Sequence, residues 1–171
     1  MTEQQFVPLD ALQVLVTHGV RFVLIGGFAA SIRGSPMLTD DLDICYARDK
    51  ENLERLAEAL RGLKATLRGA PEGIPFLLDA RTLEAGDHFT FSTSFGALDC
   101  LGTPAGTRGF ADLDADATDE DLDGVSIRVA SVDGLIRMKR AVQRPKDRIA
   151  LEWLAALREE LERGGRDSQD S

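Results

Sequence analysis

The sequence predicts an α/β fold, a mixed and curved sheet of about four to six strands with helices packed on it and C-terminal helices closing one side. Three observations predict it. The apolar run 22–25 ends in two glycines that open a short helical stretch. The segment 41–46 begins by alternating charged and apolar residues, as a half-buried strand does. Two stretches with a helical apolar period, 8–18 and 52–60, lie on either side of these strands.

In the first half of the chain, the helix 8–18 is expected to end before Gly19. The strand 22–25 is followed by a short helix, 28–33, which the segment Gly34-Ser35-Pro36 stops. The strand 41–46 and the helix 52–60 follow. We therefore expect the order helix, strand, helix, strand, helix.

In the second half, strands are expected at 76–79, 88–92, 96–101 and 124–130. Ser131 is a candidate N-cap for a helix to about residue 143, and Pro145 can begin the last helix. That helix carries an apolar residue every four positions, and we expect this stripe to face the core, with Trp153 as a packing residue (Ile149, Trp153, Leu157, Leu161). The polar segment 164–171 is expected to be a disordered tail, which leaves a single domain, 1–163.

Composition and charge limit the function classes. The chain has 171 residues, 43% of them hydrophobic, and a formal net charge of −9, which argues against a protein that coats nucleic acid non-specifically. No apolar run approaches the ~20 residues of a membrane span, and the N-terminus lacks the pattern of a secretory signal. We therefore expect a cytoplasmic protein without a membrane partner.

The two cysteines fit that compartment. Alternation places Cys45 on the same strand face as Asp43 and Cys100 on the face opposite Asp99, so a disulfide between them is not expected. Two lone cysteines and two lone histidines, His18 and His88, have no zinc-ligand spacing.

Charge is unevenly distributed. Residues 112–123 contain seven acidic residues and no basic one, whereas residues 128–148 contain seven basic residues and two acidic ones. The acidic run is interpreted as solvated surface, although it could also dock a partner. The basic run suits either a solvated surface or contacts to phosphates.

Asp41 and Asp43 are the first candidate site residues. On a strand they share one face and lie about 7 Å apart along the chain, where their like charges raise each other's pKa. A divalent cation would remove this repulsion, and Mg²⁺ prefers such oxygen ligands. Gly26 and Gly27 would let the backbone approach a phosphate, and the helix they open would offer it unpaired N–H groups. This order of elements suits a nucleoside triphosphate.

Asp99 is the best candidate for a third metal ligand. It lies in the middle of an expected strand, between Leu98 and Cys100, where a bare carboxylate is costly. A site with two metal ions needs such a group to help hold the ion that activates the attacking oxygen.

These motifs carry a family resemblance. The Gly-Gly pair, the gap to an Asp-x-Asp strand and a later aspartate on another strand resemble the nucleotidyltransferase fold of the polymerase-beta superfamily. Within it, the chain resembles the AbiEii-like and MenT-type toxins over roughly residues 20 to 155, including the segment IRMKRAVQRPKDRIALEWL.

The resemblance implies further site residues. Lys139 would contact the triphosphate, and Asp147 would support the site or orient that lysine. Without the resemblance, Lys139 would be interpreted as an exposed helical lysine and Asp147 as a first-turn helix residue. Arg144, with Lys146 and Arg148, could contact phosphates.

Thr39 is a second implied position. MenT-type toxins have a hydroxyl residue just before the acidic pair that is phosphorylated when the toxin is silenced, so Thr39 is a candidate for regulatory phosphorylation. A strand-entry threonine without that role is equally compatible with the sequence.

The function expected from the resemblance is Mg²⁺-dependent transfer of a nucleotidyl group from an NTP, with two metal ions held by Asp41, Asp43 and Asp99. The implied acceptor is the 3′ end of tRNA, the implied donor is a pyrimidine nucleotide, CTP being favoured, and the implied partner is a cognate antitoxin. Three alternatives remain open: an enzyme that modifies an antibiotic, one that modifies a protein, and a nucleotide-binding regulator without catalysis. The sequence leaves the nucleotide, the acceptor, the oligomeric state and the antitoxin undetermined.

Overall fold

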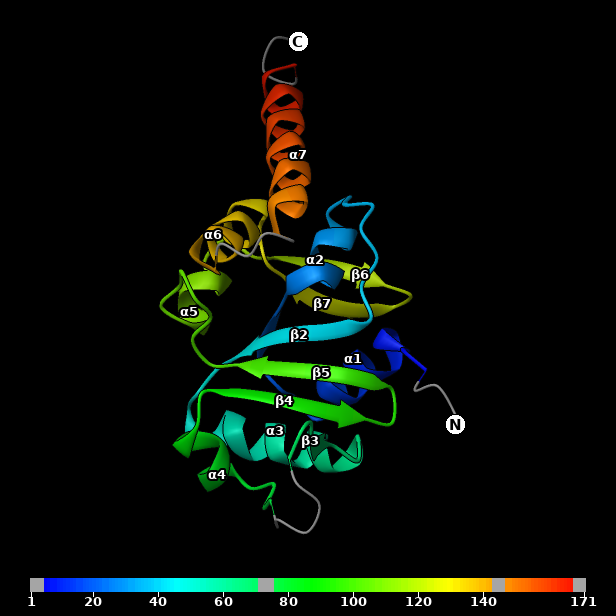
Figure 1. Ribbon diagram of the computed structural model, residues 1–171, viewed down its shortest axis with the longest axis vertical. Helices are drawn as coiled ribbons and strands as arrows, with labels where there is room; N and C mark the ends of the chain where they lie inside the picture. Colours follow the sequence, from blue (N-terminus) through cyan, green and yellow to red (C-terminus); the bar gives the residue numbers. More distant parts are fainter. Residues whose placement is uncertain (1–4, 71–75, 143–146, 168–171) are drawn as a thin grey trace.

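A computed structural model describes residues 5–70, 76–142 and 147–167. Its centre is one seven-stranded sheet with the strand order β3-β4-β5-β2-β1-β7-β6 (Figure 1). The strands are β1 (Phe22–Ile25), β2 (Asp41–Tyr46), β3 (Thr66–Leu67), β4 (His88–Thr93), β5 (Gly96–Leu101), β6 (Thr118–Leu122) and β7 (Val125–Val129). The sequence-based expectation of about four to six strands is therefore too low, because the two edge strands β3 and β6 were not expected.

The sheet is mixed, as the sequence predicts. β1 is antiparallel to β2 and parallel to β7, whereas β2 is parallel to β5. Leu42 and Ile44 of β2 are buried, and the side chains that alternate with them, Asp41 and Asp43, are only partly covered. Since successive side chains of a strand point to opposite faces, β2 gives its apolar residues to the core and its carboxylates to the other face.

Helices cover the apolar face of the sheet. In Figure 1, α1 (Pro8–Thr17) and α3 (Lys50–Gly62) lie behind the strands, where the two helices contact each other. Asp49 caps α3 by accepting a hydrogen bond from the Asn52 amide, so the helix begins two residues before the expected 52. Leu53, Leu56 and Leu60 are buried, as the helical period predicts.

Helix α4 (Ala80–Ala85) packs against α3 (Figure 1). The remaining helices lie toward the other end of the sheet: α2 (Gly26–Ile32), α5 (Phe110–Asp114), α6 (Val132–Val142) and α7 (Asp147–Asp167). Ser131 Oγ accepts a hydrogen bond from the Gly134 amide, which confirms Ser131 as the N-cap of α6. The far end of α7 projects away from the body of the protein in Figure 1.

Residues 76–79 do not form the expected strand. Phe76 packs against Phe89 and Phe91 of β4, with ring centroids 6.2 Å apart in both cases. Among the described residues, no strand pairing accompanies this packing. Asp79 then caps α4 by accepting a hydrogen bond from the Thr82 amide. The apolar run serves side-chain packing, which a strand-like composition alone cannot distinguish from strand pairing.

The expected core stripe of the last helix is also wrong. The side chain of Trp153 is 46% exposed, and Ile149 and Leu161 are exposed too, whereas Leu154 is buried at 1%. A spacing of four residues advances by more than one helical turn, so the stripe rotates around the helix instead of staying on one face. In addition, α7 continues to Asp167, so residues 164–167 are helical, and 168–171 lie outside the described residues.

The acidic run 112–123 is largely structured. It includes the end of α5 and all of β6, and several of its carboxylates pair with arginines. Arg128 donates to Asp114 at 2.7 Å, and Arg33 donates to Glu120 at 2.8 Å. The run is therefore part of the fold at one edge of the sheet, and Asp116, Asp119, Asp121 and Asp123 are exposed there, as the interpretation as solvated surface requires.

Neither a disulfide nor a membrane-spanning helix is expected from the sequence. Cys45 and Cys100 are buried free thiols, so no disulfide joins them. None of the described helices combines the length and the apolar character that crossing a membrane requires.

Candidate active site

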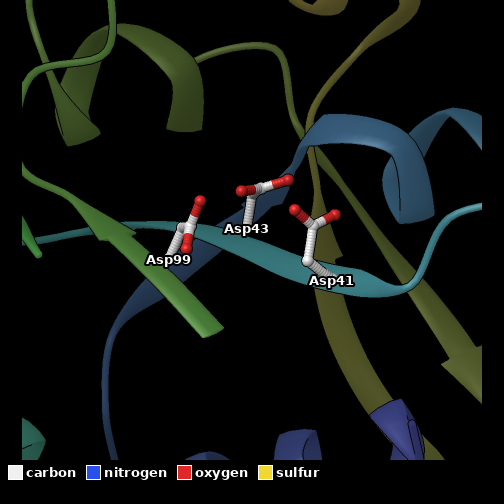
Figure 2. Close-up of side chains that lie close together, drawn as sticks. All are labelled: Asp41, Asp43 and Asp99. Atoms are coloured by element: carbon white, nitrogen blue, oxygen red, sulfur yellow. The ribbon is translucent and has the colours of Figure 1, made fainter. Parts of the chain in front are cut away.

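Asp41, Asp43 and Asp99 converge on one face of the sheet. Each offers a carboxylate oxygen that lies within 4.8 Å of the others. Figure 2 shows the three side chains rising from β2 and β5 toward a common point. The structure thus brings together the three carboxylates that the sequence singled out.

The register of the two central strands explains this convergence. β2 and β5 are parallel neighbours, and Asp43 is paired directly with Asp99. Paired residues on adjacent strands project to the same face, and Asp41 follows on that face because it is two residues from Asp43.

Asp43 lies in the electrostatic centre of the cluster. Burial, followed by the neighbouring charges of Asp41 and Asp99, raises the pKa of Asp43 to about 7, and Lys139 opposes this rise. The carboxyl group is therefore partly protonated at neutral pH when no cation is present. Such a group favours a bound cation, because the cation removes the repulsion.

The three carboxylates fit a divalent metal ion. They supply a donor set of oxygens only, which Mg²⁺ prefers, and the repulsion between them raises the pKa of Asp43 in spite of the opposing charge of Lys139. This cluster could therefore hold the metal that the sequence predicts.

Gly26 closes one side of the cluster. It has a φ of +75°, and a Cβ atom at this position would overlap the Asp43 carboxylate. The following residue, Gly27, faces Thr39, whose Oγ1 would lie 3.1 Å from a Cβ atom on that glycine. Helix α2 begins at Gly26, two residues before the expected residue 28, so the glycines form its first turn. The backbone here approaches the carboxylates with no intervening side chain.

Thr39 belongs to the same side of the site. Its hydroxyl donates a hydrogen bond to Oδ1 of Asp41 at 2.9 Å. The threonine thus lies between the first turn of α2 and the first carboxylate of the cluster.

Lys139 and Asp147 form an ion pair beside the cluster. The Nζ of Lys139 donates to Oδ1 of Asp147 at 2.8 Å, and Asp147 is buried, with 4% of the residue exposed. Asp147 thereby fixes the lysine, which is close enough to the carboxylates to lower the pKa of Asp43. The structure joins two residues that only the family resemblance, and not the residue pattern, connected.

One cleft of about 390 Å³ contains these residues. Eight of the predicted site residues line it: Gly26, Gly27, Thr39, Asp41, Asp43, Asp99, Lys139 and Asp147. Arg148, the one other predicted phosphate contact that the structure describes, is exposed and does not line the cleft. Arg144 and Lys146 lie outside the described residues. The exposed His88 also lines the cleft, and apolar residues such as Met37, Leu38, Met138 and Val142 complete its wall.

Sequence reasoning missed one charged residue at the cluster. The Nη2 of Arg68 donates to Oδ1 of Asp99 at 2.5 Å. Arg68 follows the two-residue strand β3, which is too short to give a periodic signal in the sequence.

No protein-family model and no curated protein matches the chain. Solved structures do match. The lincosamide antibiotic adenylyltransferase LnuA, bound to lincomycin, superposes with a TM-score of 0.60 at 12% identity over 90% of this chain and 99% of that chain. ANT(2″)-Ia in complex with adenylyl-2″-tobramycin superposes with a TM-score of 0.53 at 15% identity, over 95% of this chain and 96% of that one. This chain therefore has the fold of these nucleotidyltransferases.

Proposed function

We propose that the protein is a nucleotidyltransferase that transfers NMP from an NTP to a hydroxyl acceptor, with pyrophosphate as the leaving group. The convergence of Asp41, Asp43 and Asp99 beside the first turn of α2 is the observation that supports it most. The similarity to adenylyltransferases of the same fold supports the same class of reaction.

In this proposal each group of the cleft has a separate task. Asp41, Asp43 and Asp99 would hold two Mg²⁺ ions. When bound, the ions supply positive charge to the triphosphate and lower the pKa of the acceptor hydroxyl. Gly26 and Gly27 leave room for phosphate oxygens next to backbone N–H groups. Lys139, held by Asp147, balances negative charge on the triphosphate.

We further propose that the acceptor is the 3′ end of tRNA and that the donor is a pyrimidine nucleotide, CTP being favoured. The enzyme would then act in the cytoplasm as the toxin of a pair whose antitoxin is a second protein. The resemblance in sequence to MenT-type toxins is the basis for the donor, the acceptor and the antitoxin. Arg140 and Arg148, both exposed and near Lys139 and Asp147 in the chain, support an RNA acceptor, because they could contact its phosphates.

Antibiotic modification is the second candidate, and the similarity to LnuA and ANT(2″)-Ia favours it. A drug site is expected to have an enclosed pocket with aromatic walls. Among the described residues that line the cleft there is no Phe, Tyr or Trp. This composition favours RNA over an aromatic-lined drug site.

Label transfer tests both candidates. The protein is incubated with Mg²⁺, each α-labelled NTP in turn, and either total tRNA or a panel of lincosamides and aminoglycosides, beside an Asp41→Ala control. Label on tRNA that depends on Asp41 would support the first candidate and identify the nucleotide. Label on a drug alone would support the second. Absence of both transfer and NTP binding would contradict the enzymatic proposal.

A further inference from the structure

Arg68 is the third charged residue in the row of paired positions that contains Asp43 and Asp99. The backbone amide of Arg68 donates to the carbonyl oxygen of Thr90 at 2.9 Å, which extends the pairing of β3 with β4 by one residue. Thr90 is paired with Asp99, and Asp99 is paired with Asp43. Four paired positions on four adjacent strands therefore place these side chains on one face of the sheet.

The intervening Thr90 is small enough for Arg68 to reach across it. The guanidinium contacts Asp99 at 2.5 Å while the arginine side chain remains 37% exposed. Asp99 is the only side-chain hydrogen-bond partner of this guanidinium among the described residues. A guanidinium has several N–H donors in a planar fork, so donors remain for a further anion.

Lys139 and Arg68, the two cations of the site, reach the carboxylates from opposite ends of the sheet. Lys139 is carried by α6, which follows β7, and the glycines of α2 follow β1. Arg68 comes from β3, at the other end of the order β3-β4-β5-β2-β1-β7-β6. The proposed triphosphate groups are thus on the side of β1 and β7, and Arg68 is on the side of Asp99.

We propose that Arg68 binds a phosphate of the RNA acceptor next to its reacting 3′ end. The inference rests on the proposed function, in which Asp99 helps to hold the ion that lowers the pKa of the acceptor hydroxyl. A guanidinium matches the geometry and charge of a phosphodiester. It would instead repel an aminoglycoside, which is a polycation, so Arg68 also favours an anionic acceptor over that class of drug.

Binding of a labelled tRNA measures this contact without requiring catalysis. The dissociation constant is measured over a range of salt concentrations, with Mg²⁺ present, for the wild type, Arg68→Gln and Arg68→Lys. Loss of one phosphate contact in Arg68→Gln is expected to weaken binding about tenfold and to reduce the slope of log K against log salt by about 0.7. Arg68→Lys keeps the charge and should restore most of that slope.

Arg55 provides a matched control. Its side chain is 43% exposed and pairs with Glu51 at 2.5 Å, but it lies on α3, behind the sheet in Figure 1. Arg55→Gln removes the same charge and an ion pair of the same length, so it should leave the salt slope unchanged. Thermal unfolding of each variant verifies that the fold is intact.

A second titration separates the two sources of phosphate. Binding of NTP at saturating Mg²⁺ should be no weaker in Arg68→Gln than in the wild type. A loss of NTP affinity with unchanged tRNA affinity would assign Arg68 to the triphosphate and overturn the inference. Unchanged affinities for both ligands, or a wild type that does not bind tRNA, would overturn it as well. If tRNA binds through Arg68 but receives no label from any NTP, the proposed function fails and the phosphate contact stands.

A third measurement uses the metal alone. Arg68 occupies an oxygen of Asp99 that belongs to the candidate metal cluster. Titration with Mn²⁺, followed by electron paramagnetic resonance, should therefore show several-fold tighter binding in Arg68→Gln than in the wild type. Equal or weaker binding would mean that Arg68 does not compete for this carboxylate, and it would contradict the placement of the guanidinium at the cluster.

Discussion

Gly26 and Asp43 lie so close that any side chain at position 26 would overlap the carboxylate. They are neighbours because Ile25, the last residue of β1, is paired with Asp43, and Gly26 follows Ile25 directly. The chain leaves β1, turns at Gly26 with a φ of +75° and begins α2 directly above the carboxylate. The backbone of α2 and the carboxylate cluster therefore depend on the same glycine.

Gly26→Ala should abolish nucleotidyl transfer, with a loss of at least about 100-fold, because the new methyl group displaces the Asp43 carboxylate. It should also lower the melting temperature, since alanine is strained at a positive φ. Gly124→Ala is the matched control: Gly124 lies between β6 and β7 with a φ of +87°, but a Cβ atom there meets no other atom within 4 Å. Similar losses of activity in the two variants would mean that backbone strain, and not the overlap with Asp43, is responsible.

Asp43→Asn should stabilise the metal-free protein while it removes activity. Burial and two neighbouring carboxylates oppose ionisation of Asp43, so an uncharged amide of the same shape relieves this repulsion. At pH 8 in EDTA, we expect the free energy of unfolding, measured in urea, to rise by about 1–3 kcal/mol. Asp40→Asn removes one exposed carboxylate just before the cluster and should change it by less than about 0.5 kcal/mol. A less stable Asp43→Asn protein would contradict the repulsion argument.

Metal binding should depend on pH around neutrality. The pKa of Asp43 is raised from 3.8 to about 7 in the folded state, so protonation of Asp43 favours folding. That contribution is complete below pH 3.8 and is lost as the pH rises through 7. A divalent ion acts in the opposite direction, because it favours the ionised carboxylate.

The rise in melting temperature caused by Mg²⁺ should therefore be clearly larger at pH 8 than at pH 6. Thermal unfolding with Mg²⁺ and with EDTA across this range measures it. In Asp43→Asn the difference between the two pH values should largely disappear. An equal effect of Mg²⁺ at both pH values in the wild type would mean that Asp43 does not titrate against the metal.

The strands that carry the three carboxylates could be predicted because each has a recognisable pattern over six residues. β2 and β5 both have the predicted bounds, and both place an aspartate among apolar residues. The pairing of Asp43 with Asp99 was not available from the pattern, since register depends on which strands become neighbours. Asp99 was predicted from its place in the middle of a strand, and the family resemblance supported it, but its pairing with Asp43 is known only from the structure.

Other features depend on contacts that have no local signal. The position of Arg68 follows from a two-residue strand at the sheet edge, and Trp153 is exposed because the buried side of α7 is set by Leu154 and not by the four-residue repeat. Most of the acidic run lies at the surface, as expected, but two of its carboxylates also pair with Arg33 and Arg128 from other elements. Long-range ion pairs of this kind cannot be inferred from charge runs alone.

The ion pair of Lys139 with Asp147 should matter for stability, whereas Lys139 itself should be required for activity. Lys139→Met leaves the buried Asp147 carboxylate without its cation, so it should reduce the free energy of unfolding by about 1–3 kcal/mol and transfer activity by at least about 100-fold. The double variant Lys139→Met with Asp147→Leu removes both charges and should recover stability but no activity. Unfolding in urea and NTP binding are the measurements. A double variant that regained NTP affinity would exclude a role for the lysine at the triphosphate.

A phosphate on Thr39 should block the nucleotide. The Thr39 hydroxyl lies against the first turn of α2 and donates to Asp41, so a phosphate there would occupy the place proposed for the triphosphate and add negative charge beside three carboxylates. Thr39→Glu, which imitates part of that charge, should weaken NTP binding at least about tenfold. Thr39→Val removes one hydrogen bond and should weaken it by less than about threefold.

Ser126→Glu is the control for added charge, because Ser126 is exposed on β7 and does not line the cleft. Equilibrium binding of NTP with Mg²⁺ is measured for all three variants and the wild type. If Ser126→Glu weakens binding as much as Thr39→Glu does, the effect comes from overall charge. If Thr39→Glu binds NTP as tightly as the wild type, the triphosphate does not pass Thr39. Phosphorylation at this position would then leave the nucleotide site open.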